Sequence, residues 1–140
     1  MKELDHLFFP KSLALVGASP SEEKLGGITL RNLLAVKGTV YPVNPKYGEI
    51  MGVCCYPTVK DIPGFMDLAV IMRPAVEVPA ILRELAGKAR FVLIVSAGFA
   101  EVGAADLQEE IIRIGREGKL RLVGPNCLGI FNPWHRLDTM

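Results

Sequence analysis

Short apolar runs alternate with amphipathic stretches along the chain, and this alternation constrains the fold more than any other feature. The apolar runs predict β-strands over residues 12–17, 39–43, 67–72, 90–98 and 121–124, the fourth of which ends in a turn. The stretches between them predict helices over residues 26–36, 75–88 and 104–119. Strands that alternate with helices indicate a parallel sheet covered on both faces. We therefore predict an α/β fold: a Rossmann-like open parallel β-sheet with helices on both faces, formed by residues 1–140 as a single domain.

The segment over residues 44–65 is rich in proline and glycine and is long for a connection inside a compact domain. Loops of this length are usually functional. Within it, the sequence predicts a short strand at 52–56 and a turn of helix after Pro57. Pro42 has no backbone N–H for a sheet ladder, so the strand over 39–43 is expected either to lie near an edge of the sheet or to end there.

Composition argues against several classes of protein and partner. The 140 residues carry 16 basic and 15 acidic side chains, and no basic stripe indicates a nucleic-acid partner. The apolar runs are far shorter than the ~20 residues that a membrane-spanning helix needs, so no membrane partner is expected. Three cysteines without a C-x-x-C spacing predict neither a disulfide framework nor a metal site. They favour a reducing, cytoplasmic location.

Glycine, proline and small polar residues follow each predicted strand, at the end where an open parallel sheet binds its ligands. These segments are therefore expected to converge on one edge of the sheet. They are Gly17-Ala18-Ser19, Asn44-Pro45-Lys46, Arg73-Pro74, Ser96-Ala97-Gly98-Phe99 and Gly124-Pro125-Asn126-Cys127.

The first of these loops predicts a phosphate site. It runs from a buried strand through Gly17 to Gly26-Gly27, which open an amphipathic helix. Backbone N–H groups at a helix N-terminus suit a phosphate, and glycine lets that phosphate approach the backbone closely. The alternative is that Gly26 and Gly27 serve only to start the helix or to allow close packing.

Two departures from the dinucleotide fingerprint count against NAD. The fingerprint needs G-x-G-x-x-G directly after the strand, whereas the glycine after Gly17 is Gly26. It also needs an acidic residue after the second strand, where this chain has Asn44-Pro45-Lys46. A lysine at that place favours a nucleotide with an extra phosphate near the ribose, as in coenzyme A (CoA) or NADP.

Cys127 follows the last predicted strand within the stretch "GPNCLG". A catalytic thiol is one interpretation, but no histidine lies near it in sequence to activate it. A small packing cysteine is the interpretation we favour, and we predict no catalytic residue in the chain.

Several stretches resemble one family. "LFFPKSLALVGAS", "YPVNPKYGEIMGVCCYPTVKDIP", "DLAVIMRPA", "VSAGFAEVG" and "LVGPNCLGIFNP" are similar to the N-terminal CoA-binding domain of NDP-forming acyl-CoA synthetases. That family includes ADP-forming acetate–CoA ligase and is related to the succinyl-CoA synthetase α subunit. The resemblance extends from about Leu7 to Pro133. It implies a Rossmann-like domain that binds CoA.

The resemblance also implies a set of CoA-binding residues. Ser19 and Lys24 would face phosphates, and Lys46 the ribose phosphate or the adenine side. Met72, Arg73 and Pro74 would flank the adenine or the pantetheine arm. Arg73 departs from the family, which often has a small or apolar residue there; because the residue before a proline is held extended, Arg73 would either reach a phosphate or face solvent. The complete set is Gly17, Ala18, Ser19, Lys24, Gly26, Gly27, Val43, Asn44, Pro45, Lys46, Met72, Arg73, Pro74, Ser96, Ala97, Gly98, Asn126 and Cys127, with Ser96 to Gly98 along the pantetheine arm and the last two near the thiol.

Full-length relatives of that family also carry a phosphohistidine domain and an ATP-grasp domain, and no segment here resembles either. His6 and His135 do not lie in a glycine-rich loop. Residues 135–140 carry no helix stop or turn signal, so we expect the N-terminal fragment of a longer synthetase, with those domains as partners in cis or in trans. The alternatives are a free-standing CoA-binding protein, the front end of a synthetase-like protein acetyltransferase and, less favoured, an NAD(P)-binding domain.

Overall fold

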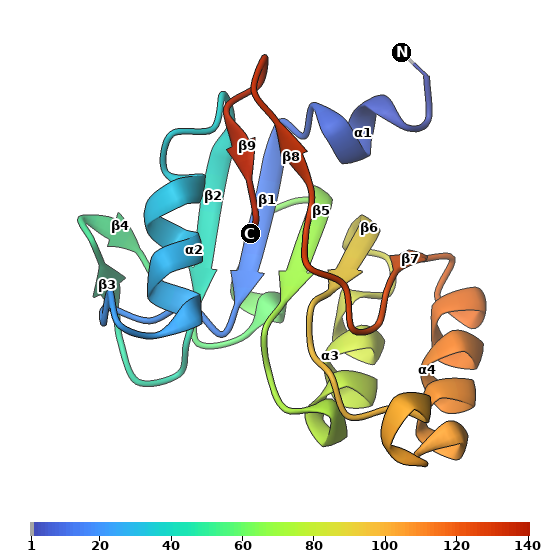
Figure 1. Ribbon diagram of the computed structural model, residues 1–140. Helices are drawn as coiled ribbons and strands as arrows, with labels where there is room; N and C mark the ends of the chain where they lie inside the picture. Colours follow the sequence, from blue (N-terminus) through green and yellow to red (C-terminus); the bar gives the residue numbers. More distant parts are fainter. Residues whose placement is uncertain (1) are drawn as a thin grey trace.

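The computed structural model describes residues 2–140 and contains a five-stranded parallel sheet (Figure 1). Across the sheet the strands are β2 (Thr39–Val43), β1 (Ser12–Val16), β5 (Met66–Ile71), β6 (Ala89–Ile94) and β7 (Arg121–Val123). Counted along the chain, this is the doubly wound order 2-1-3-4-5. The predicted Rossmann-like α/β fold is confirmed.

Helices and a hairpin cover the two faces of the sheet (Figure 1). One face carries α2 (Leu25–Leu33) and the hairpin of β8 (Phe131–Asn132) and β9 (Leu137–Asp138), with α1 (Asp5–Phe8) beside them. The other face carries α3 (Val78–Leu85) and α4 (Ala105–Glu117). Single 3₁₀ turns lie at η1 (Val59–Asp61), η2 (Ala75–Glu77) and η3 (Ala100–Val102).

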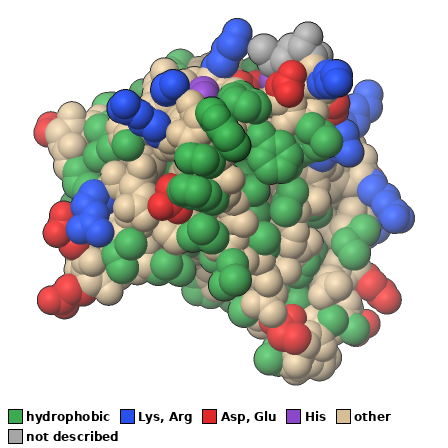
Figure 2. Space-filling model, turned by 45° about the horizontal axis from the view of Figure 1, so that its top comes forward, with side chains coloured by type: hydrophobic (Ala, Val, Ile, Leu, Met, Phe, Trp, Pro, Cys, Tyr) green, Lys and Arg blue, Asp and Glu red, His purple; other side chains and the backbone are tan. Residues whose placement is uncertain are grey.

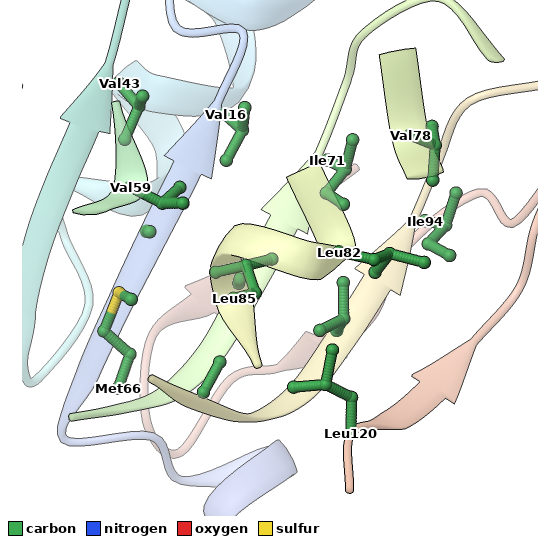
Figure 3. Close-up of a cluster of buried hydrophobic side chains, with 14 of the residues drawn as sticks. Val16, Val43, Val59, Met66, Ile71, Val78, Leu82, Leu85, Ile94 and Leu120 are labelled. Carbon is green, nitrogen blue, oxygen red and sulfur yellow. The ribbon is translucent and has the colours of Figure 1, made fainter. Parts of the chain in front are cut away.

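Alternate residues of each strand enter two separate hydrophobic cores, because successive side chains of a strand point to opposite faces. In β1, Ala14 and Val16 belong to the core under α3 and α4, whereas Leu13 and Leu15 belong to the core under α2. All four are buried. Figure 3 shows the first core, with Leu82 and other side chains of α3 packed against residues of the central strands. Burial on both sides accounts for the near-continuous apolar character of the strands.

The strand that contains Pro42 is an edge strand, as predicted: β2 pairs with β1 in the main sheet. On its other side, the carbonyl of Pro42 accepts a hydrogen bond from the N–H of Tyr56 at 3.0 Å. Tyr56 and Val43 form an isolated parallel bridge. The missing N–H of Pro42 therefore interrupts no ladder with a second strand.

The sequence located the elements well but not all of their ends. The helix predicted over 26–36 begins at Leu25 and ends at Leu33. Within 44–65, the predicted short strand is one half of an antiparallel pair, β3 (Glu49–Ile50) and β4 (Val53–Cys54), and the turn after Pro57 is η1. The predictions missed β3 because two residues carry no periodicity.

The β8–β9 hairpin was also not predicted, because its short strands are held by side-chain contacts to distant segments. Asn132 donates from Nδ2 to the Phe8 carbonyl at 2.6 Å, and Nε2 of His135 lies 2.8 Å from the Pro10 carbonyl. Phe131, Trp134 and Met140 are exposed around this hairpin. In Figure 2, hydrophobic side chains gather in the middle of the face in view. Among the helices described, none has both the length and the apolar character to cross a membrane.

Thr29 in α2 supports a prediction about stability. The side chain is fully buried, and Oγ1 has no hydrogen-bond partner among residues 2–140. An unsatisfied buried polar group costs about 1–3 kcal/mol. We expect Thr29→Val to raise the free energy of unfolding by about 1 kcal/mol, measured as a higher urea midpoint at an unchanged m-value.

The control for this prediction is Thr29→Ser, which keeps the hydroxyl and removes the methyl group. It should lower the free energy of unfolding by about 1 kcal/mol, because a buried methyl group is lost. A Thr29→Val variant less stable than the wild type would show that the hydroxyl has a stabilising partner.

Candidate functional site

A cavity of about 610 Å³ opens at the carboxyl ends of β1, β2 and β5. Here the strand order reverses, because the chain passes from β1 outward to β2 and then returns to β5 on the other side. Open parallel sheets bind their ligands at such a switch point. Eleven of the predicted residues line the cavity, namely Gly17, Ala18, Ser19, Lys24, Gly26, Val43, Asn44, Pro45, Lys46, Met72 and Arg73.

The turn after β1 is closely packed and needs glycine at three positions. Gly17 has φ of 101°, and a Cβ there would overlap the Met72 carbonyl oxygen. A Cβ on Gly26 would overlap the Gly17 carbonyl oxygen, and one on Gly27 the Ser21 carbonyl oxygen. Close packing of this segment therefore requires glycine at positions 26 and 27, whether or not a phosphate binds beside them. Gly27 does not line the cavity, and Gly26 does.

The N-terminus of α2 leaves two backbone donors at the cavity wall. Gly27 and Ile28 both donate to the Lys24 carbonyl at 3.0 Å. The N–H groups of Leu25 and Gly26 have no acceptor among residues 2–140, and both residues line the cavity. Free N–H groups at a helix N-terminus, with the positive end of the helix dipole, favour a bound anion. This wall can hold a phosphate.

Two lysines add positive charge to the same cavity. Lys24 is the N-cap residue of α2, and Lys46 lies beyond the end of β2. Both are exposed, and in the part of the chain that the structure describes neither forms an ion pair. They are therefore available to an anionic ligand, one beside the first loop and the other beside the second.

Asn44 joins these two loops. Its Nδ2 donates to the Ala18 carbonyl at 2.9 Å, and its Oδ1 accepts from the Lys46 N–H at 2.9 Å. The second contact is an Asx turn that sets the start of the lysine segment. Beneath it, the Cys55 thiol lies 3.6 Å from the Asn44 carbonyl, and burial raises the pKa of Cys55. Asn44 thus holds Lys46 in place relative to the loop after β1.

Arg73 lies beside the same loop in a contact that neither sequence interpretation described. Its Nε donates to Oε2 of Glu77 at 2.7 Å, and its Nη2 donates to Oε1 at 2.9 Å. Hydrogen bonding to Glu77 raises the pKa of Arg73, and the same contact lowers the pKa of Glu77. Both side chains line the cavity, so Arg73 is a cavity residue with an anchored guanidinium.

Seven predicted residues do not line this cavity: Gly27, Pro74, Ser96, Ala97, Gly98, Asn126 and Cys127. Those that follow β6 and β7 form a neighbouring group farther along the same edge of the sheet. The Asn126 N–H donates to the Ser96 carbonyl at 3.0 Å, and Oγ of Ser96 donates to the Ile71 carbonyl at 3.5 Å. This group therefore connects to the cavity side through β5.

Glu101 holds the loop after β6. Its Oε1 accepts from the N–H of Gly98 at 2.5 Å and from the N–H of Phe99 at 3.1 Å. These backbone hydrogen bonds, chiefly that from Gly98, hold the pKa of Glu101 below its ordinary value of 4.5. Because the folded pKa is depressed, the resulting stability is fully present above pH 4.5 and is lost as the pH falls through the folded pKa.

We therefore expect Glu101→Gln to be less stable than the wild type at pH 7, with a difference that shrinks as the pH falls below 4.5. Thermal unfolding of both proteins between pH 7 and pH 3 measures this. Glu109→Gln on the exposed side of α4 is the control and should show no such convergence. A constant difference between the wild type and Glu101→Gln across this range would contradict the proposed charge-assisted contact.

Nine cavity residues were not predicted: Val16, Leu25, Tyr47, Pro57, Thr58, Val59, Glu77, Ile81 and Glu84. Glu77, Ile81 and Glu84 come from η2 and α3, whose position beside the cavity only the fold defines. Their spacing of four and three residues, which places them on one helical face, was an available signal. Pro57 and Val59 give the wall around them an apolar part.

Together these walls fit a ligand that carries phosphate and an apolar part. Free backbone N–H groups and lysines lie on one side, and apolar residues such as Val59 and Ile81 on another. The glycines of the turn after β1 allow the backbone to pack closely on the side of the cavity that carries the free N–H groups. Within residues 2–140, His, Cys, Asp and Glu side chains do not gather in threes that could hold a metal ion. The arrangement provides for binding and positioning of a phosphorylated ligand.

Sequence comparison identifies the family of the chain. The family model described as CoA binding domain matches residues 11–133. The chain therefore belongs to the CoA-binding domain family, as its motifs predicted, and CoA is the ligand of this class of domain.

In the relatives, the region that matches this chain is part of a larger protein. An ADP-forming acetate–CoA ligase of Methanocaldococcus jannaschii is 44% identical over 98% of this chain and 20% of its own length. The α subunit of ADP-forming acetate–CoA ligase II of Pyrococcus furiosus is 41% identical over 97% of this chain and 31% of its own length. A solved structure of dinucleotide-forming acetyl-coenzyme A synthetase 1 of Ca. Korarchaeum cryptofilum, in complex with phosphate and ADP, superposes with a TM-score of 0.94 at 39% identity. It covers 99% of this chain and 31% of that one. The chain thus spans less than a third of each of these proteins.

Proposed function

We propose that this chain is the CoA-binding domain of an ADP-forming acyl-CoA synthetase and that it binds CoA without completing the ligase reaction alone. The observation that carries this proposal is the cavity at the switch point in a chain of the CoA-binding domain family. Within residues 2–140, N–H groups of α2 at its wall have no acceptor and its two lysines form no ion pair. The ligase names of the relatives support the parent reaction, in which an acid, CoA and ATP yield acyl-CoA, ADP and phosphate.

Phosphates account for the polar walls of the cavity. The N–H groups of Leu25 and Gly26, with Ser19 and Lys24, would hold the pyrophosphate of CoA. Lys46 would pair with the 3′-phosphate on the ribose, because Asn44 holds its backbone beside the first loop. The adenine would lie against the apolar part of the wall.

The pantetheine arm would run along the same sheet edge past β6 and β7. Ser96, Ala97 and Gly98 would line the arm, and Asn126 and Cys127 would lie near its end. The thiol of bound CoA supplies the nucleophile for acyl transfer. This domain would hold the ligand so that its thiol projects toward the other domains. Its contribution to the reaction would therefore be positioning.

The partners that we propose are the remaining synthetase domains, in cis or in trans. One relative is named as the ligase and another as a subunit of a ligase, and both extend well beyond the region that this chain matches. A reducing compartment, the cytoplasm, is also proposed. Its support is that Cys54, Cys55 and Cys127 are all free thiols.

Titration calorimetry with CoA, 3′-dephospho-CoA, NAD and NADP tests the proposed ligand. CoA should bind most tightly and dephospho-CoA more weakly. NAD should not bind comparably, because no acidic residue follows β2 to hold a ribose diol. NADP should not bind comparably either, because the loop after β1 lacks the G-x-G-x-x-G spacing of dinucleotide-binding domains. A preference for NAD or NADP over CoA would refute the proposal.

A further inference from the structure

Arg73 lies where the pyrophosphate of a dinucleotide-like ligand would pass. The residue follows β5 directly after Met72, at the switch point of the sheet. Its Cδ lies 3.2 Å from the position that a Cβ on Gly17 would occupy, so its stem packs against the turn after β1. That turn leads to the free N–H groups at the start of α2. The preceding strand and the following Pro74 restrict the backbone of Arg73 to extended conformations.

Glu77 holds this arginine from the first turn before α3. The pair is bidentate, with N···O distances of 2.7 and 2.9 Å, and uses Nε and Nη2 of the guanidinium. The remaining nitrogen, Nη1, has no acceptor among residues 2–140. A planar guanidinium held on one edge by a carboxylate keeps donors on its other edge in a fixed direction.

We propose that Glu77 is a positioning residue for ligand binding: it orients Arg73 so that the free edge of the guanidinium contacts the pyrophosphate of CoA. The inference rests on the proposed function, because the ligand is the one proposed there. It assigns Glu77 a role although a carboxylate would by itself repel a phosphate. The role follows because both Glu77 oxygens are already occupied by Arg73 and the pair has no net charge.

The competing explanation is an ion pair that only stabilises the local fold, since exposed ion pairs are common and contribute little. The chain offers a matched control for it. Arg113 and Glu117 form an i,i+4 pair at 3.6 Å on α4, and neither lines the cavity. If Glu77 only stabilised the local fold, Glu77→Gln and Glu117→Gln would have the same effect on the Kd for CoA.

The experiment is a double-mutant cycle on the Kd for CoA, measured by calorimetry on Arg73→Ala, Glu77→Gln and the double variant. Arg73→Ala should weaken CoA binding about tenfold or more, and Glu77→Gln should weaken it by a smaller factor. The double variant should match Arg73→Ala, because Glu77 acts through the arginine. The same factors are expected with dephospho-CoA, which keeps the pyrophosphate. Glu117→Gln should leave the Kd unchanged.

Three results would overturn the inference: tighter or unchanged CoA binding by Glu77→Gln, independent effects that multiply in the double variant, or no effect of Arg73→Ala. Thermal unfolding of each variant without ligand shows whether a weaker Kd reflects a loss of folded protein. Failure of the proposed function is distinguishable, because the wild-type chain would then not bind CoA at all.

Discussion

Gly26→Ala should destabilise the protein by about 3 kcal/mol, although alanine in a helix normally stabilises by about 1 kcal/mol relative to glycine. The expected sign is reversed because the new methyl group would overlap the carbonyl oxygen of Gly17, which is backbone and cannot rotate away. Relief requires the turn after β1 to move away from α2. CoA binding should be lost with it, since that movement displaces the phosphate wall. Urea unfolding and calorimetry measure the two effects.

Gly48→Ala is the matched control for this substitution. A Cβ at Gly48 meets no atom within 4 Å, and the residue has no positive φ. Its free energy of unfolding should change by less than about 1 kcal/mol, and its affinity for CoA should remain. Equal stability of the Gly26→Ala and Gly48→Ala variants would mean that the turn tolerates a side chain and is not the close packing described above.

The second large effect is expected at Lys46. Lys46→Ala should weaken CoA binding by about 10- to 100-fold, which corresponds to the roughly 1.5–3 kcal/mol of a hydrogen bond to a charged group. The same substitution should leave the Kd for 3′-dephospho-CoA nearly unchanged, because that ligand lacks the phosphate that Lys46 is proposed to contact. Calorimetry with the two ligands measures the ratio of their affinities.

Two further lysines make this prediction specific. Lys24→Ala should weaken binding of both ligands by a similar factor, since Lys24 lies at the N-terminus of α2 beside the proposed pyrophosphate position. Lys37→Ala removes an exposed lysine that does not line the cavity and should change neither Kd. If Lys46→Ala weakened CoA and dephospho-CoA equally, the assignment of the 3′-phosphate to Lys46 would be wrong.

Much of the fold could be predicted from the sequence because its main signals are local. Buried parallel strands appear in the sequence as apolar runs. Pro42 indicated an edge strand because proline has no backbone N–H to donate to a neighbouring strand. The β8–β9 hairpin could not be predicted, because it depends on hydrogen bonds such as that between Asn132 and the Phe8 carbonyl, which join opposite ends of the chain. Short strands held in this way leave no periodic pattern.

In the candidate site, too, the residues with local sequence signals could be predicted and those placed by tertiary structure could not. The loop residues that line the cavity follow strands, so the rule for parallel sheets located them. Glu77 and Glu84 come from η2 and α3, and only the tertiary structure shows that they line the cavity. Sequence likewise suggested that Arg73 was either a phosphate ligand or solvent-facing, whereas its partner four residues away determines where the guanidinium lies.

A crystal structure of the chain with bound CoA would show where the ligand lies on the sheet. We predict that the adenosine phosphates occupy the cavity at the ends of β1, β2 and β5, with the pyrophosphate against the N–H groups of Leu25 and Gly26 and the 3′-phosphate beside Lys46. Density for CoA away from the carboxyl edge of the sheet, with this cavity empty, would contradict the account.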